Sequence, residues 1–98
     1  MPAYIIVDVT VLNKDEYEGY KKLTPGSLAA YGGKFIVRGG STECLEGDWH
    51  PERIVILQFD DTKRAKDWWS SVEYAPAKEI RQRNASTKMI LVEGIAPM

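Results

Sequence analysis

The sequence predicts an α+β fold whose strands and helices follow one another in the order βαββαβ. Residues 3–12 (AYIIVDVTVL) are rich in β-branched side chains that alternate between two faces, which is typical of a strand. A helical stripe at i, i+3, i+4 and i+7 is formed by Ala65, Trp68, Trp69 and Val72. A chain of 98 residues builds one hydrophobic core, so we expect a single domain over residues 1–98.

The first helix is predicted to begin after Asn13, because Glu16 stands three residues later and completes a capping box. Proline has no N–H to donate, so residues 24–25 (Thr-Pro) predict a kink or break within this helix. The glycine pair at 32–33 predicts the helix end, since glycine readily adopts the left-handed conformation that closes a helix.

The second half of the chain contains three further strands and one further helix. Residues 34–40 and 52–60 predict an antiparallel hairpin. Residues 61–62 (Asp-Thr) offer a cap for the next helix, and Pro76 opens a separate helical piece, so both helices are expected to be split. Residues 88–95 (KMILVEGI) predict the last strand, which gives the ferredoxin-like arrangement with antiparallel sheet order 4-1-3-2 and both helices on one face.

The alternation of the strands divides their side chains between two sheet faces. For the face under the helices we expect Ile5, Val7, Val9, Val11, Phe35, Val37, Val55, Leu57, Phe59, Ile90 and Val92. For the other face we expect Tyr4, Ile6, Asp8, Thr10, Ile36, Arg38, Ile54, Ile56, Gln58, Met89, Leu91 and Glu93. So large an apolar surface favours an interface, and a homodimer that encloses the polar minority is the simplest one.

Composition excludes several classes of function. The chain has 13 basic and 14 acidic residues and a formal net charge of -1, which argues against nucleic-acid and anionic-membrane partners. The single cysteine and single histidine predict neither a disulfide nor a zinc site, and no cofactor motif is present. With no export or membrane signal, we expect a cytoplasmic protein.

Several motifs in order carry a family resemblance: YGGKFIVRGG at 31–40, LEGDW at 45–49, RIVILQF from Arg53, WWSSVEY at 68–74, and Arg81. This combination resembles the bacterial DUF1330 family, a domain of unknown function in the dimeric α+β barrel group. The resemblance implies a ferredoxin-like fold and a dimer, and no established activity. The wider group includes cofactor-free monooxygenases, isomerases, haem-binding enzymes and ligand-binding modules, so the fold leaves the chemistry open.

The candidate ligand-binding residues are Arg38, Gly39, Arg53, Tyr74 and Arg81. Arg38 precedes a glycine pair, so an anion could approach its guanidinium closely, and convergence of two of the three arginines would favour a carboxylate ligand. The alternative for Arg38 is an ion pair with Asp8 or Glu46. Tyr74, at the junction of two helical pieces, is either a hydrogen-bond donor or acid/base group in a pocket, or a packing residue.

Asp8 is the second candidate acid/base group, because desolvation in a dimer cavity would raise its pKa. The only histidine, His50, precedes a proline in a loop and is expected to be exposed. The leading hypothesis is a homodimer that binds a small anionic or carbonyl metabolite. The alternatives are a cofactor-independent monooxygenase or isomerase, and a purely structural or stress-related dimer.

Overall fold

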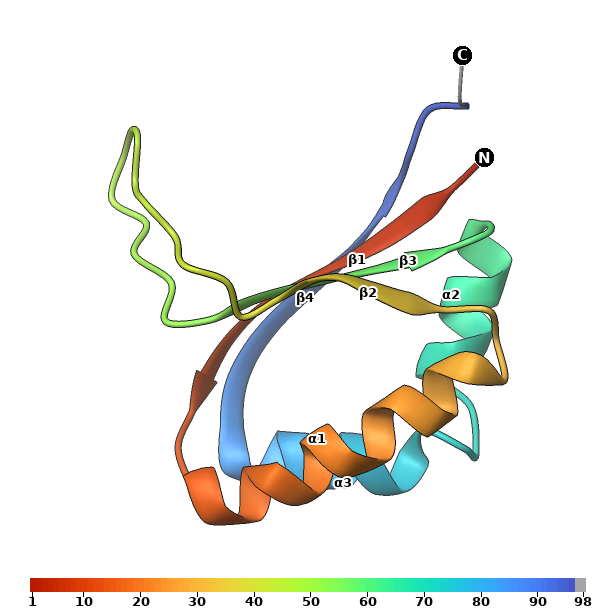
Figure 1. Ribbon diagram of the computed structural model, residues 1–98, viewed down its shortest axis with the longest axis horizontal. Coiled ribbons are helices and arrows are strands. Elements are labelled where there is room, and N and C mark those ends of the chain that lie inside the picture. Colours follow the sequence, from red (N-terminus) through yellow and green to blue (C-terminus); the bar gives the residue numbers. More distant parts are fainter. Residues whose placement is uncertain (97–98) are drawn as a thin grey trace.

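The computed structural model describes residues 1–96 as a four-stranded antiparallel sheet with three helices (Figure 1). In chain order the elements are β1 Ala3–Val11, α1 Lys14–Ala29, β2 Lys34–Arg38, β3 Ile54–Phe59, α2 Thr62–Trp69, α3 Ala75–Asn84 and β4 Ala85–Glu93. The sheet order β2-β3-β1-β4 is the predicted 4-1-3-2 read in reverse, so the ferredoxin-like arrangement is confirmed. Within residues 1–96, no helix is long and apolar enough to cross a membrane.

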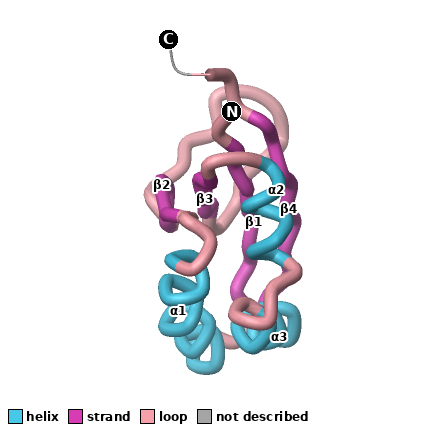
Figure 2. The backbone as a smooth tube through the Cα atoms, turned by 90° about the vertical axis from the view of Figure 1, so that its right-hand side faces the viewer, coloured by secondary structure: helices cyan, strands magenta, loops and turns pink. Residues whose placement is uncertain are grey.

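The helices lie on one side of the sheet, and the long β2–β3 loop (residues 39–53) extends from the other side (Figures 1 and 2). The core fills the space between the sheet and the helices. Its largest fully buried side chains are Trp68, Tyr74 and Phe59. Trp68 packs on Tyr74 with ring centroids 3.9 Å apart and donates its indole N–H to Ser27 Oγ at 3.0 Å, which ties α2 to α1.

Helix α1 begins as predicted, with the Asn13 side chain accepting from the Glu16 N–H, but it is not broken at Pro25. Proline removes the hydrogen bond that the Lys21 carbonyl would normally accept from the residue four positions later. Arg38 Nη2 from β2 donates to that carbonyl at 3.3 Å instead. Of the predicted kink or break, the break is therefore wrong, and a side chain from β2 supplies a donor in place of the missing N–H.

Two of the four residues in the predicted buried stripe of α2 are buried. Ala65 and Trp68 are fully buried, whereas Trp69 is 43% exposed and Val72 is 83% exposed. The reason is that α2 ends at Trp69, so the helical spacing no longer applies to Val72. The split from α3 is confirmed, and Ser71 Oγ accepts the Tyr74 N–H just before α3 begins.

The face assigned to the last strand is wrong. β4 begins at Ala85, directly after α3, and its register pairs Ile5 with Leu91 and Val7 with Met89. Met89 and Leu91 therefore lie under the helices, and Ile90 and Val92 lie on the open face. Both sets are apolar, so alternation alone could not decide between the two registers.

The face of Arg38 is also different from the prediction. A β-bulge between Phe35 and Val37 shifts the β2 register, so that Val37 pairs with Ile56 and Arg38 pairs with Val55. An extra residue in one strand reverses the faces of the residues that follow it. Arg38 consequently lies on the helix side, away from Asp8, and the ion pair between these two residues is not formed.

The open face keeps a continuous apolar surface on the side of the sheet without helices. The register places Ile6 between Ile56 and Ile90, and Tyr4 between Gln58 and Val92. Ile90 is 59% exposed and Val92 is 40% exposed. This surface is far more apolar than a solvated sheet face requires.

Candidate functional site

A group of cationic and phenolic side chains lies between α1 and the β2–β3 side of the sheet, and we call this space the arginine pocket. Its main cavity has a volume of about 410 Å³ and is lined by Lys14, Tyr17, Lys21, Gly39 and Arg53, with Glu18 and Glu52. A separate small cavity of about 20 Å³ shares Tyr17, Lys21 and Arg53 with the main cavity and is also lined by Tyr20 and Arg38; we treat it as an extension of the arginine pocket. The pocket is thus enclosed by α1, the end of β2 and the start of β3.

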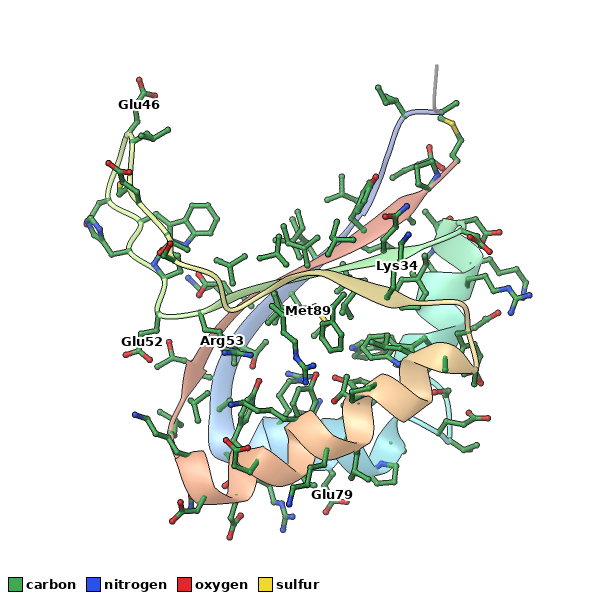
Figure 3. The ribbon with its side chains drawn as sticks, in the orientation of Figure 1. Lys34, Glu46, Glu52, Arg53, Glu79 and Met89 are labelled. Carbon is green, nitrogen blue, oxygen red and sulfur yellow. The ribbon has the colours of Figure 1, made fainter. Side chains whose placement is uncertain are left out.

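Arg53 lies on the helix side of the sheet, just before β3 (Figure 3). Its guanidinium crosses directly over Gly39, which adopts the left-handed conformation with φ +74°. A methyl group on Gly39 would displace the Arg53 guanidinium from this position, and the positive φ would strain any residue with a side chain. Glycine at this position therefore allows Arg53 to reach the pocket.

Arg38 also lines the extension. Its guanidinium carbon lies 4.2 Å from the centroid of the Phe35 ring, and one Nη bonds the Lys21 carbonyl as described above. These contacts fix the guanidinium between β2 and α1. They leave most of its N–H groups available for an acceptor in the pocket.

A chain of hydroxyl groups runs from the arginine pocket into the core. The centroids of the Tyr17 and Tyr20 rings lie 5.1 Å apart on one face of α1. Tyr20 Oη is 2.8 Å from Tyr74 Oη. The Tyr74 hydroxyl in turn accepts a hydrogen bond from Arg81 Nε at 3.2 Å. We call Tyr20, Tyr74 and Arg81 the tyrosine–arginine chain; it links α1 to α3.

Burial keeps these phenols neutral at ordinary pH. It raises the pKa of Tyr17 to about 12, an effect reinforced by Tyr20 and opposed by Arg53, Arg81 and Arg38. Burial likewise raises the pKa of Tyr20 and of Tyr74, and Arg81 opposes the rise in both. The three tyrosines therefore serve as hydrogen-bonding groups, and a resting tyrosinate base is not available among them.

The three arginines lack anionic partners. None of the guanidinium groups of Arg38, Arg53 and Arg81 forms an ion pair with a carboxylate within residues 1–96. Arg81 is only 6% exposed, and the buried Arg53 Nε has no hydrogen-bond partner in the same range. Buried charges are normally paired, so Arg81 and the buried part of Arg53 are suited to an anion that comes from outside the chain.

The residues singled out from the sequence divide into two groups. Arg38, Gly39 and Arg53 meet at the arginine pocket, whereas Tyr74 and Arg81 lie deeper, and Tyr20 joins the two groups. Tyr74 is fully buried, so it reaches the pocket only through Tyr20.

The other acid/base candidate, Asp8, is on the open face, apart from both groups. Its carboxylate accepts the Trp49 indole N–H at 2.8 Å. His50 is exposed in the β2–β3 loop, and its Nε2 lies 3.7 Å from Asp48 Oδ1. Among residues 1–96, no cluster of three metal-ligating side chains is present.

Sequence reasoning missed Tyr17, Tyr20 and Lys21 as pocket residues. The i, i+3 spacing of the two tyrosines indicates the inward face of α1 but does not distinguish a packing ring from a hydroxyl at a cavity wall. Lys21 belongs to the pocket only because β2 folds over this part of α1. As a whole, the cationic and hydroxyl groups of this arrangement are suited chemically to negative charge.

The comparisons with known proteins agree with the sheet order and the motifs. The family model for DUF1330, a domain of unknown function, matches residues 2–95. The chain belongs to the DUF1330 family. No protein of curated function matches it.

Three solved structures show the same fold at low sequence identity. A protein of unknown function from Rhodopseudomonas palustris has a TM-score of 0.78 at 18% identity, covering 98% of this chain and 84% of that one. SnoaB, a cofactor-independent oxygenase from Streptomyces nogalater, has a TM-score of 0.69 at 15% identity, covering 99% and 96%. A dimeric ferredoxin-like protein of unknown function from Jannaschia sp. CCS1 has a TM-score of 0.72 at 11% identity, covering 96% and 100%.

The raised tyrosine pKa values predict a loss of stability at alkaline pH. Between about pH 10 and about pH 12 the unfolded chain releases the Tyr17 proton while the folded chain keeps it, so the free energy of unfolding falls as pH rises. Below this range Tyr17 contributes no pH dependence. Tyr17→Phe should make the alkaline loss shallower in urea unfolding curves measured across the range. Tyr4→Phe, on the open face, is the control, and an equal effect of both variants would contradict the assignment.

Proposed function

We propose that this protein binds a small organic anion, a carboxylate or the enolate of a carbonyl compound, in the arginine pocket. The observation that supports the proposal is that Arg53, without a carboxylate partner in residues 1–96, lines two adjacent cavities beside neutral phenols, the smaller of which Arg38 also lines. Four cationic side chains line the two parts of the pocket against the carboxylates of Glu18 and Glu52. Guanidinium and phenol N–H and O–H groups are suited to carboxylate and enolate oxygens.

Arg53→Ala should weaken binding of malonate or pyruvate by about tenfold to a hundredfold, the range expected for lost hydrogen bonds to a charged group. Isothermal titration calorimetry measures this directly. Arg53→Lys keeps the charge but loses the planar fork and should give an intermediate affinity.

The matched control is Arg83→Ala, which removes an exposed arginine from the last turn of α3 and should leave binding unchanged. If neither anion binds the wild-type protein, or if the two alanine variants bind equally well, the pocket has a different role. A purely structural dimer would then be the better description.

A second candidate is a cofactor-independent oxygenase, which the likeness to SnoaB favours. In such a reaction the positive pocket would stabilise an enolate or phenolate substrate, which can react with oxygen directly. Burial raises the pKa of Tyr20 and of Tyr74, so neither phenol is a base at neutral pH, and a substrate that ionises readily suits this pocket best.

This second candidate predicts oxygen uptake with readily ionised dihydroxynaphthalenes in the absence of added metal, flavin or haem. An oxygen electrode would record a rate above that of uncatalysed oxidation, reduced in Arg53→Ala and unchanged in Arg83→Ala. A rate equal to the uncatalysed one in the wild type would leave ligand binding as the function.

The third part of the proposal is that two copies pair through the open sheet faces. It is supported by the exposed aliphatic surface around Ile6, Ile56 and Ile90 and by dimeric ferredoxin-like relatives of the same fold. The β2–β3 loop extends on this side and would flank a partner sheet (Figure 1).

Ile90→Lys should shift the protein from dimer to monomer, because a charge would be buried at the centre of the pairing surface. Analytical ultracentrifugation measures the change. Val72→Lys introduces the same charge at an apolar residue that is 83% exposed between α2 and α3, and it should leave the dimer intact. A monomeric wild type contradicts the pairing.

A further inference from the structure

A second cavity lies on the other side of the tyrosine–arginine chain, between β4 and the helices α2 and α3. It has a volume of about 580 Å³ and shares no lining residue with the arginine pocket. We call it the β4 cavity. Its size is within the range of small-molecule sites in proteins.

The walls of the β4 cavity are mainly apolar. Ile5, Met89 and Leu91 contribute from the helix side of the sheet, and Ala65 and Trp69 contribute from α2. Figure 3 shows Met89 on the helix side of the sheet, facing this layer. An aromatic or branched aliphatic group fits such walls, because it would remove apolar surface from water on both sides.

The charged group deep in this cavity is Arg81. Its side chain is 6% exposed, and within residues 1–96 its one side-chain hydrogen bond is the Nε contact to Tyr74. A guanidinium has five N–H groups, so most of its donors have no protein acceptor in that range. Because Tyr74 fixes the Nε side, the remaining donors are held ready for an external acceptor.

The other polar groups of the lining favour an anion over a cation. Thr87 Oγ1 is buried in the same wall without a hydrogen-bond partner in residues 1–96. Lys66 is exposed at the cavity, and no carboxylate is among the described residues that line it. A buried arginine, a neighbouring lysine and no acid together select negative charge.

We propose that the β4 cavity is a separate site for an apolar monocarboxylate, an aromatic or branched aliphatic acid whose carboxylate binds Arg81. Its apolar body lies against Trp69, Met89 and Leu91. This site goes beyond the function proposed above, since the arginine pocket has polar, multiply charged walls and suits a smaller and more polar anion.

The first test compares phenylacetate with its neutral analogue phenylacetamide on the wild-type protein. Titration followed by NMR should shift the Arg81 Nε–H, the Trp69 indole N–H and the Met89 methyl signals. Phenylacetate should bind at least about tenfold more tightly than the amide, as expected for a charged hydrogen-bonded pair. Equal affinities, or no shift of these three signals, overturn the proposal.

Variants separate this site from the arginine pocket. Leu91→Trp should fill the cavity and abolish phenylacetate binding, and Arg81→Gln should reduce it at least about tenfold. Arg53→Ala, which disables the other pocket, and Arg83→Ala, which removes an exposed arginine outside both cavities, should leave phenylacetate binding unchanged.

If Arg53→Ala abolishes phenylacetate binding while Leu91→Trp does not, the acid occupies the arginine pocket and the β4 cavity is not its site. Conversely, phenylacetate binding that is lost only in Leu91→Trp and Arg81→Gln supports the β4 cavity even if malonate and pyruvate fail to bind. Should either substitution at Arg81 or Leu91 prevent folding, the wild-type comparison of acid and amide still decides.

Discussion

The hydrogen-bonded contact between Tyr20, Tyr74 and Arg81 is the interaction that organises this protein. It joins α1 to α3 beneath the sheet, through Tyr20 Oη, Tyr74 Oη and Arg81 Nε. Trp68 stacks against Tyr74 and bonds to Ser27, so the same ring that holds the chain also anchors α2. Because a buried guanidinium needs acceptors, loss of the Tyr74 hydroxyl would leave the buried Arg81 Nε–H without a hydrogen-bond partner. The chain also forms the wall between the two cavities.

Three arginines without carboxylate partners in the described part of the chain lie on the helix side of the sheet, and they are the groups most suited to binding an anion. The net charge of the whole chain is close to zero, yet Arg38, Arg53 and Arg81 all lie in the layer between sheet and helices without carboxylate partners among residues 1–96. Arg81 is buried and Arg53 is half-buried, and charge in such surroundings is screened less than at the surface, so these two guanidinium groups attract an anion more strongly than the exposed Arg38 does. The raised tyrosine pKa values follow from the same burial, and they leave the phenols as neutral partners for that anion.

The bulge in β2 shows how local irregularity builds a site. It turns Arg38 from the open face to the helix side, where the guanidinium replaces the N–H that Pro25 cannot donate to the Lys21 carbonyl. One side chain thereby keeps α1 continuous and lines the arginine pocket. Gly39, next in the chain, provides the space for Arg53. The hydrogen bond from Arg38 to the Lys21 carbonyl thus connects the bulge in β2 with the proline-containing turn of α1.

The order of elements and the sheet order could be predicted from the amino-acid sequence, because they follow from local propensity, caps and alternation, and the family could be predicted from its ordered motifs. It also singled out the arginines and Gly39, since a guanidinium beside glycine is a local signal. Tertiary structure alone decided the faces of Arg38, Val37, Ile90 and Val92, since a bulge shifts register without a sequence signature and β4 is apolar on both faces. It alone also divided the candidate residues between two cavities and added Tyr17 and Tyr20, because which side chains share an enclosed space depends on how distant elements pack.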